Sequence, residues 1–246
     1  MGKTVVEAVE SADDMECVCG IDVNADESDS SCAFPVFNDL ERAIGECEFD
    51  VMVDFTQPTS VEGNIAAAIS KGIDCVVGTT GLSDQTLQKL SALATNDACL
   101  FYAPNFTTGA VLMMQFAKAA APYFPEAEVI EFHHSKKKDA PSGTAVNTAK
   151  MIAEARDGKR SSAPGSETEL EGMEGARGAD VDGVYVHSVR SMGFVASQEV
   201  IFGSYGQTLS IKHDSWDRQS YMPGVLLGIR SVGNRSGLIV GLENFM

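Results

Sequence analysis

Short apolar runs alternate with amphipathic stretches up to residue 104, and this alternation constrains the fold more than any other feature of the chain. Continuous apolar runs are typical of strands that are buried on both faces of a parallel sheet. Amphipathic helices between such strands provide the crossovers that parallel pairing requires. We therefore predict βαβ units, with strands at residues 16–21, 50–55, 74–77 and 99–102 and helices at 3–10, 39–45, 59–71 and 83–95.

The second half of the chain predicts a mixed α/β region. Residues 157–182 are polar, rich in Gly, Ser and Glu, and lack periodicity. We interpret them as a long loop, and loops of that size are more often functional than accidental. Helices are predicted at residues 109–121, 144–156 and 221–230, and strands at 128–132, 184–190, 195–202, 208–213 and 237–242.

The charge and cysteine content exclude several kinds of partner. With 35 acidic and 18 basic residues, the chain offers no broad basic surface to displace counterions from nucleic-acid phosphates. No signal segment or membrane-length apolar run occurs. The six cysteines include no CxxC pair, which favours buried thiols in a reducing cytosol over metal ligands. We therefore expect a cytoplasmic protein that binds no nucleic acid, no membrane and no metal.

Three predicted strand ends carry residues that suit a nucleotide, because parallel sheets bind ligands beyond the carboxyl ends of their strands. Asp22 lies 20 residues after Gly2, the spacing between the last glycine of a dinucleotide fingerprint and the acid that binds the adenosine ribose. Gly78-Thr79-Thr80-Gly81 and Ala103-Pro104-Asn105-Phe106 follow two later strands. Each segment is compatible with a plain turn, but together they favour nucleotide binding.

The start of the chain does not fit a complete dinucleotide fold. Such a fold begins with a central strand and a Gly-rich turn that holds the pyrophosphate, whereas this chain enters a helix directly after Met1-Gly2. Loss of a central strand leaves backbone groups of its neighbours unpaired. We therefore expect the numbered chain to begin late, through a misassigned start or a truncation.

Positive charge and proton donors gather in the segment 131–144, which reads EFHHSKKKDAPSGT. His133 and His134 follow the end of a predicted strand, so both can lie at its mouth. Pro141 suits a first helical turn, whose free N–H groups and dipole bind carboxylates. A histidine near its ordinary pKa supplies protons at neutral pH. A solvated basic turn would explain the three lysines alone, but the whole cluster favours a carboxylate substrate that must also be protonated.

The same segment resembles the signature of the dihydrodipicolinate reductase family, also known as 4-hydroxy-tetrahydrodipicolinate reductases. The signature residues are His133, His134, Lys137 and the run Asp139-Ala-Pro-Ser-Gly-Thr144. Met1-Gly2 is similar to the last two residues of the family's Gly-Arg-Met-Gly loop. The resemblance covers nearly the whole chain through Val53-Asp-Phe-Thr56, Gly78-Thr-Thr-Gly81, Ala103-Pro-Asn-Phe106, His187-Ser-Val-Arg190 and Asp217-Arg218 to Gly224.

The resemblance implies a Rossmann-like dinucleotide-binding domain at 1–104, completed by 213–246, and a mixed α/β substrate domain at 105–212 that forms a homotetramer. It implies reduction of 4-hydroxy-tetrahydrodipicolinate, a cyclic dicarboxylate imine, to tetrahydrodipicolinate with NADH or NADPH, in the diaminopimelate route to lysine. The implied proton donor is His133, assisted by Lys137. The implied substrate-binding residues are His134, Ser142, Gly143 and Thr144, and the implied cofactor-binding residues are Gly2, Asp22, Gly78, Thr79, Thr80, Ala103, Pro104, Asn105 and Phe106.

Two further expectations concern activity and cofactor choice. The alternative to an enzyme is a family member that has lost catalysis and persists as a dicarboxylate-binding or assembly subunit. The missing loop favours this alternative, and the intact donor cluster disfavours it.

Asp22 accepts hydrogen bonds from a ribose but repels a 2′-phosphate, and Lys3 is the nearest candidate cation in the sequence. We therefore expect NADH to be used at least as well as NADPH.

Overall fold

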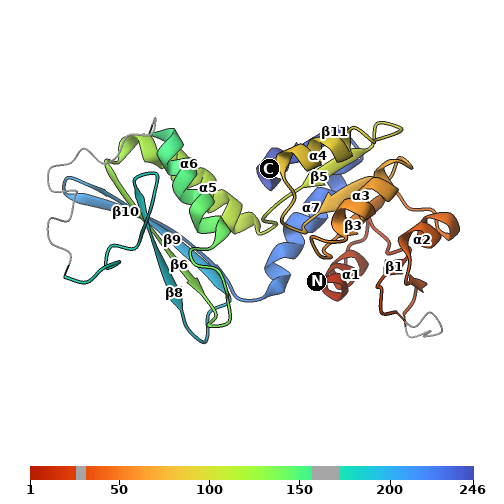
Figure 1. The fold of residues 1–246 in the computed structure, drawn as a ribbon, viewed down its shortest axis with the longest axis horizontal. Coiled ribbons are helices and arrows are strands. Elements are labelled where there is room, and N and C mark those ends of the chain that lie inside the picture. The colour runs from red at the N-terminus through yellow and green to blue at the C-terminus, as the bar shows by residue number, and fades with distance from the viewer. Residues whose placement is uncertain (26–31, 157–171) are drawn as a thin grey trace. The chain divides into compact units, whose positions relative to one another are not determined.

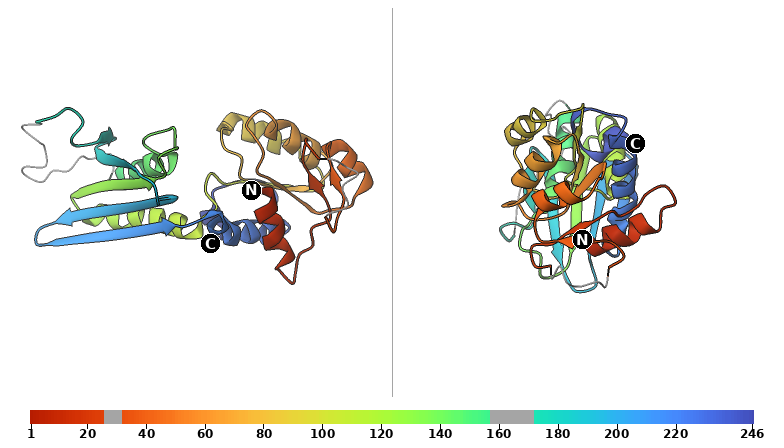
Figure 2. Two further views of the ribbon diagram at one scale, coloured as in Figure 1. Left: turned by 90° about the horizontal axis from the view of Figure 1, so that it is seen from below. Right: turned by 90° about the vertical axis from the view of Figure 1, so that its right-hand side faces the viewer.

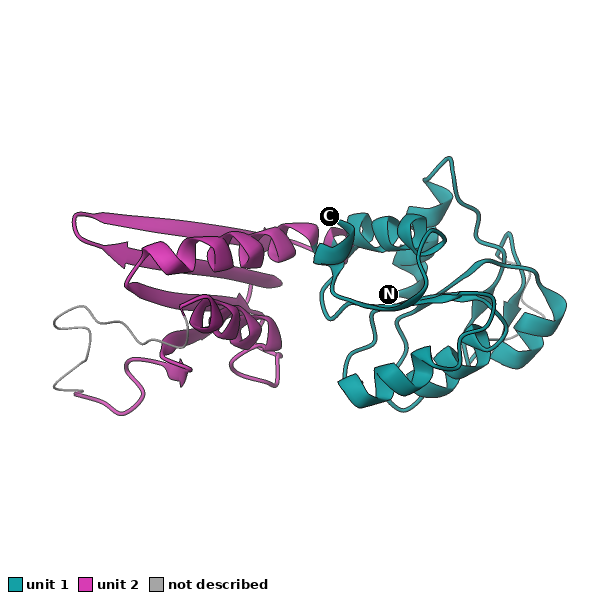
Figure 3. Ribbon diagram, turned by 90° about the horizontal axis from the view of Figure 1, so that it is seen from above, with its two compact units in different colours: residues 1–107, 221–246 teal, residues 108–220 magenta. Residues whose placement is uncertain are grey.

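The computed structural model describes residues 1–25, 32–156 and 172–246, which form two compact units (Figures 1 and 3). Unit 1 comprises Met1–Thr107 and Tyr221–Met246, and unit 2 comprises Thr108–Ser220. The chain thus builds unit 2 from one continuous segment and returns to unit 1 for its last helix and strand.

Unit 1 is built on a four-stranded parallel sheet with helices on both faces. Helix α7 (Met222–Val232) lies beside α1 (Gly2–Glu10), as Figures 1 and 2 show. Helices α3 (Val61–Ile69) and α4 (Asp84–Ser91) pack on the other face. The strand order is β11-β5-β4-β3, with bounds Gly237–Val240, Cys99–Tyr102, Asp74–Val77 and Val51–Asp54.

Successive residues of β4 point to two buried faces. Cys75 and Val77 pack with α3 and α4, whereas Val76 lies against α7 at Gly228. A Cβ at Gly228 would approach the ring of Phe101 to 2.8 Å, so glycine lets α7 come close to the sheet. This burial on both faces explains the continuous apolar runs and confirms the predicted α/β fold class with a Rossmann-like domain.

The first strand of the chain is shorter than the sequence predicts. Of residues 16–21, only β1 (Gly20–Ile21) is a strand, and it pairs in parallel with the unpredicted β2 (Val36–Phe37). Strands β1 and β2 form a separate sheet, and β3 is an edge strand of the main sheet. Within the described ranges, no strand pairs with residues 16–19, and an unpaired strand lacks the ladder that would stabilise it. Helix α2 (Leu40–Glu46) follows, capped by Asp39, whose Oδ1 accepts a hydrogen bond from Arg42 N at 2.8 Å.

Unit 2 is built on a five-stranded mixed sheet of order β10-β9-β6-β8-β7. β6 (Glu126–His133) pairs in parallel with β8 (Val184–Arg190) and antiparallel with β9 (Ala196–Ser204). The remaining strands are β10 (Gln207–Ser215) and β7 (Ala179–Val181), and the helices are α5 (Thr108–Ala120) and α6 (Gly143–Ala155). Three short 3₁₀ helices complete the described elements: η1 (Ala121–Tyr123), η2 (Arg218–Tyr221) and, in unit 1, η3 (Leu242–Phe245).

The two faces of this sheet have different environments. Helices α5 and α6 cover one face, where Val129, Val200 and Phe202 are fully buried. Side chains of the other face, such as Ile130 and Tyr185, are only partly buried, and no helix in the described ranges covers them. We call this second surface the open face of unit 2.

Strand β7 corrects the prediction of an aperiodic loop over 157–182. It pairs antiparallel with β8 through a turn at Asp182 and Gly183, which have φ angles of 52° and 88°. An Asp-Gly pair with positive φ at both residues is the favoured two-residue hairpin turn. The Asp182-Gly183 pair was therefore a signal for this hairpin in the sequence. Residues 157–171 of the predicted loop lie outside the described residues.

The structure also bears on membranes, metals and cysteines. No helix in the described ranges is long and apolar enough to span a membrane. Nor does any group of three His, Cys, Asp or Glu in these ranges have a geometry that could hold a metal ion. All six cysteines fall within the described ranges and are free thiols, but only Cys75 and Cys99 are buried and Cys32 is exposed, so the expectation of buried thiols holds for two of them. Burial raises the pKa of Cys99 to about 11. A thiol with a raised pKa is a poor nucleophile and a poor metal ligand.

Candidate active site

Glu131 and His133 lie on the same face of β6, because alternate residues of a strand point to the same side. This is the helix-covered face of the sheet, where Val129 is buried. Arg190 joins them from the end of β8, where its Cα is paired with that of His133. Parallel pairing of β6 and β8 thus brings together Glu131 and Arg190, which are 59 positions apart in the sequence.

The carboxylate of Glu131 is fully buried and has partners for both of its oxygen atoms. Arg190 donates two hydrogen bonds, from Nη2 to Oε1 at 2.7 Å and from Nη1 to Oε2 at 2.8 Å. His133 Nδ1 lies 2.5 Å from Oε2, and the backbone N–H of Ser142 donates to Oε1 at 3.2 Å. A buried carboxylate is tolerated when it is paired and hydrogen-bonded in this way.

This environment shifts two pKa values. Burial alone would raise the pKa of Glu131, but hydrogen bonds led by that from Arg190 outweigh it and hold the pKa below its ordinary value. Burial lowers the pKa of His133, and the positive charges of Lys137 and Arg190 act in the same direction, against the opposing effect of Glu131. At neutral pH the Glu131 carboxylate is therefore ionised, and His133 is mainly neutral in the free protein.

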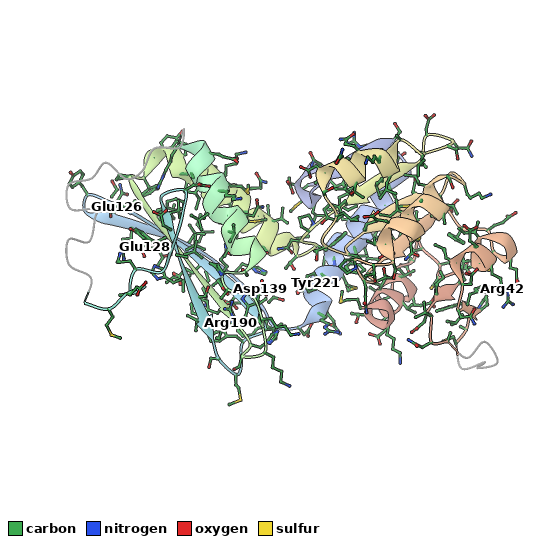
Figure 4. All side chains as sticks on the ribbon, in the orientation of Figure 1. Arg42, Glu126, Glu128, Asp139, Arg190 and Tyr221 are labelled. Atoms are coloured by element: carbon green, nitrogen blue, oxygen red, sulfur yellow. The ribbon has the colours of Figure 1, made fainter. Side chains whose placement is uncertain are left out.

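A tight turn follows β6 and carries the basic residues. His134 is exposed, and its carbonyl accepts a hydrogen bond from Lys137 N at 3.1 Å. The side chain of Lys137 pairs with Asp139, with Nζ 2.9 Å from Oδ1, and this hydrogen bond holds the pKa of Asp139 below its ordinary value. The carbonyl of Asp139 accepts a hydrogen bond from Arg190 Nη2 at 2.7 Å, and Figure 4 labels both residues. The turn is therefore anchored to the Glu131 network.

Helix α6 begins directly after this turn. Ser142 is its N-cap: its Oγ accepts a hydrogen bond from Ala145 N at 3.2 Å, and its side chain is buried. The Ser142 hydroxyl, predicted from the sequence as a substrate ligand, thus serves the helix in this structure. Gly143 is exposed, and a Cβ there would meet nothing within 4 Å. The N–H groups of Gly143 and Thr144 lie in the first turn, where a helix provides no intrahelical acceptor, so they suit a carboxylate.

In unit 1, a second buried carboxylate organises the ends of β3 and β4. Asp54 Oδ1 accepts hydrogen bonds from Thr79 Oγ1 at 2.7 Å and from Thr56, N at 2.9 Å and Oγ1 at 2.8 Å. Its Oδ2 accepts from Asn64 Nδ2 at 2.8 Å. Thr79, predicted to contact a cofactor, is buried, and its hydroxyl serves this network. A cofactor contact from Thr79 would therefore use its backbone.

The other predicted cofactor residues of these strand ends differ in exposure. Gly78 is needed by the protein itself, because a Cβ there would overlap the ring of Phe55 at 2.1 Å. Thr80 and Pro104 are exposed, Asn105 is partly buried, and Asn105 Oδ1 accepts a hydrogen bond from Thr107 N at 2.8 Å. Ala103 and Phe106 are buried in the core, and the Phe106 ring packs against the rings of Phe55 and Phe101.

Asp22 and Gly2 complete the predicted cofactor set. Asp22 is exposed at the end of β1, and its Oδ1 accepts a hydrogen bond from Asn24 N at 2.9 Å. Gly2 is the exposed first residue of α1, and a Cβ there would meet no atom within 4 Å. The exposed carboxylate of Asp22, the exposed residues Thr80 and Pro104 after β4 and β5, and the exposed start of α1 are among the groups that a dinucleotide site uses. The residues present therefore fit a dinucleotide in unit 1.

Sequence reasoning missed the residues that organise the site. Glu131 and Asp54 have their roles because they are buried, and Arg190 because β8 pairs with β6. The predicted strand ended at residue 132, so its alternation did not include His133; β6 runs to His133, and this places Glu131 and His133 on one face. No signal in the sequence links Arg190 to Glu131, because the register of paired strands is not written in either strand alone.

Two family models match the chain. The model described as dihydrodipicolinate reductase, N-terminus, matches residues 1–106, and that described as dihydrodipicolinate reductase, C-terminus, matches residues 109–246. The second match includes α7 and β11, which the structure packs into unit 1. Together the two models account for nearly the whole chain.

Curated relatives and solved structures agree with these matches. The 4-hydroxy-tetrahydrodipicolinate reductase of Mycolicibacterium vanbaalenii is 47% identical over 99% of this chain and 93% of its own length. That of Streptococcus thermophilus is 47% identical over 100% of this chain and 95% of its own length. A dipicolinate-bound dihydrodipicolinate reductase from Paenisporosarcina sp. TG-14 has a TM-score of 0.89 and 42% identity, covering 100% of this chain and 95% of its own. A probable dehydrogenase from Thermotoga maritima, with a TM-score of 0.63 and 12% identity over 99% of this chain and 89% of its own, shares the fold alone.

Proposed function

The chain belongs to the dihydrodipicolinate reductase family and is an NAD(P)H-dependent 4-hydroxy-tetrahydrodipicolinate reductase, and on that premise we propose how its residues divide the work. His133 donates the proton that the reaction consumes. Lys137 is the cationic partner that assists His133, and Lys137, His134 and the first turn of α6 bind the substrate carboxylates. The observation that carries this proposal is the position of His133, held by Glu131 at the same strand end that leads into α6.

The overall reaction requires a proton donor. The product lacks the 4-hydroxyl group of the substrate, so a hydride and a proton together replace that hydroxyl with hydrogen and release water. The nicotinamide supplies the hydride when it is bound. The protein must supply the proton, and His133 suits this task because its Nε2 is not engaged by Glu131.

The surroundings of His133 suit a substrate with two carboxylates. Lys137 provides a cation, and the N–H groups of Gly143 and Thr144 provide donors at the positive end of the α6 dipole. The solved relative from Paenisporosarcina is described as bound to dipicolinate, a ring with two carboxylates. An incoming carboxylate can replace Asp139 as the partner of Lys137, because Asp139 is well exposed, with 59% of its side chain accessible.

In unit 1, Asp22 would accept hydrogen bonds from the adenosine ribose of the cofactor, and Gly2 at the start of α1 would hold its pyrophosphate. Residues 78–80 and 103–106, after β4 and β5, would hold the rest of the cofactor. Asp54 supports this surface by fixing Thr56 and Thr79.

We expect NADH to serve at least as well as NADPH. The Asp22 carboxylate disfavours a 2′-phosphate, and Lys3, the candidate cation, is exposed in the first turn of α1. Asp26, Glu27 and Asp29, which add to the negative charge of this segment, lie outside the described residues. Steady-state kcat/KM with each cofactor measures the preference, and a strong preference for NADPH would contradict this charge argument.

The assembly is a homotetramer in the cytoplasm, formed through the open face of unit 2. Support comes from the partly buried apolar side chains of Ile130, Tyr185 and Ile201 on that face, without a covering helix in the described ranges. Such a surface is typical of one that packs against another copy of the chain. Sedimentation velocity measures the assembly, and a monomer at micromolar concentration would contradict it.

The assignment of His133 and Lys137 is tested by substitution. We expect His133→Gln and Lys137→Ala each to lower turnover by about 10²–10⁴-fold, the usual contribution of a general acid. For Lys137→Ala, KM should also rise, because a carboxylate-binding cation is lost. Lys150→Ala, an exposed lysine on α6, is the matched control and should behave as the wild type. Wild-type turnover in either site variant, with normal circular dichroism, would remove that residue from the mechanism.

A further inference from the structure

Glu131 takes no direct part in the proposed chemistry, yet it is fully buried and charged. Hydrogen-bond donors from Arg190, His133 and Ser142 converge on its carboxylate, two of them from Arg190. Val129, two residues earlier on the same face of β6, shows that this face packs with apolar side chains. Because burial of a charge is costly, packing alone does not account for a glutamate at this position.

The contact between Glu131 and His133 determines which ring nitrogen can exchange a proton. An ionised carboxylate only accepts hydrogen bonds, so His133 Nδ1 must carry a hydrogen when it lies 2.5 Å from Oε2. The exchangeable proton of the imidazolium therefore resides on Nε2. The same contact fixes the plane of the ring, because Nδ1 must remain within hydrogen-bond distance of a carboxylate that is itself held in place.

Arg190 holds that carboxylate in place. Its two N–H groups bind both oxygen atoms, an arrangement that fixes orientation as well as distance. Its positive charge also balances Glu131. Glu131 therefore orients the ring without acting as an uncompensated negative charge, which would hold His133 permanently protonated and make it a weak acid.

The same network reaches the turn that binds the substrate carboxylates. Arg190 Nη2 donates to the carbonyl of Asp139 at 2.7 Å, just before α6. Glu131 Oε1 accepts from the N–H of Ser142, the N-cap of that helix, at 3.2 Å. The proton donor and the first turn of α6 are thus attached to a single carboxylate, so their separation is fixed before substrate arrives.

We propose that Glu131 and Arg190 are positioning residues of this reductase: Glu131 fixes the ring of His133 with Nε2 as the donor atom, and Arg190 fixes Glu131 and the start of α6. The inference rests on the proposed role of His133 as proton donor. It adds that these two residues hold the ring of His133 and the carboxylate-binding turn at a fixed separation.

A double-mutant cycle separates this role from a general structural one. We expect Glu131→Gln to lower kcat by about 10–100-fold, as loss of an orienting partner of a functional histidine typically does. His133→Gln and the double variant should have the same kcat, because Glu131 acts only through His133. Glu154→Gln, which removes an exposed carboxylate from α6, is the control for charge and should match the wild type. A double variant that is slower than His133→Gln by the full effect of Glu131→Gln would overturn the proposal.

The pH profile gives a second readout. If His133 must be protonated, kcat/KM falls as the pH rises through its pKa. Loss of the Glu131 charge lowers that pKa further, so the falling limb in Glu131→Gln should move to lower pH. Arg190→Lys keeps the positive charge but loses the paired hydrogen bonds, so it should lower kcat with a smaller movement of the limb. Unmoved limbs in both variants would contradict the proposal.

Nuclear magnetic resonance of ¹⁵N-labelled histidine tests the tautomer directly in the wild-type protein, whether or not Glu131→Gln folds. The His133 signal is identified by its absence from His133→Gln. Above its pKa, His133 should carry its hydrogen on Nδ1, and a hydrogen on Nε2 instead would refute the inference. If His133→Gln itself retained wild-type turnover, the proposed function would fail. If His133→Gln is slow but His133 of the wild type carries its hydrogen on Nε2, only the positioning role is refuted.

Discussion

The sheet of unit 2 carries the same three residue types as a cluster on each of its faces, and β6 contributes the glutamate to both. In each cluster the glutamate pairs with a histidine and an arginine, and Figure 4 labels Glu128 of one cluster and Arg190 of the other. The clusters are Glu131, His133 and Arg190 on the helix-covered face, and Glu128, His187 and Arg177 on the open face.

The two clusters differ in burial and in the nitrogen that each histidine uses. The side chain of Glu131 is 0% exposed and that of Glu128 is 33% exposed. His133 is held through Nδ1, which leaves Nε2 at the tip of the ring for a substrate. His187 uses that tip, because its Nε2 lies 2.6 Å from Glu128. The two clusters therefore share their residue types, and burial and the engaged nitrogen are what distinguish them.

The largest difference in stability should follow removal of the two arginines. Arg190→Met leaves Glu131 buried without its main partner, and loss of one partner of a buried pair costs about 3 kcal/mol or more. Arg177→Met breaks a pair that is partly exposed to solvent within one copy of the chain, so we expect a loss of about 0–1 kcal/mol from the chain itself, apart from any effect on assembly. Urea unfolding of the two variants measures both values. Equal losses would show that burial does not distinguish the clusters.

A smaller effect should appear on the acid side of the stability profile. The folded-state pKa of Glu131 is depressed, so its stabilising contribution is present above the ordinary carboxyl pKa and is lost as the pH falls through the folded value. The difference in unfolding free energy between wild type and Glu131→Gln should therefore shrink as the solution is acidified. Glu128→Gln, measured in parallel, controls for loss of a carboxylate from the same strand. A difference that stays constant with pH would contradict this interpretation.

Much of the fold was predictable from local patterns. The strands at 74–77 and 99–102 have the predicted bounds, because continuous apolar runs between helices leave few alternatives. The prediction was wrong over residues 16–19 because a strand requires a neighbour, and pairing is not a local property. It missed β7 because three residues in a polar segment show no periodicity, although the Asp182-Gly183 turn marked the hairpin.

The site was predictable to a different degree. The motif from His133 to Thr144 identified the candidate donor and the start of α6, since the residues are contiguous. The support behind them depends on contacts between distant segments, such as that of Arg190 with Glu131. The sequence also did not reveal the roles of two hydroxyl groups. The Ser142 hydroxyl accepts a hydrogen bond from Ala145 N, and the Thr79 hydroxyl donates one to Asp54, and both contacts exist only in the folded chain.

We infer that His133, mainly neutral in the free protein, becomes the proton donor when a dicarboxylate binds beside it. Two negative charges close to the ring should raise the pKa of His133, so binding at neutral pH should take up protons. Titration calorimetry of dipicolinate, in buffers of different ionisation enthalpy, measures this uptake. We expect uptake in the wild type and in His187→Gln of unchanged oligomeric size, and loss of uptake in His133→Gln. Binding without proton uptake in the wild type, or uptake that persists in His133→Gln, would contradict this inference.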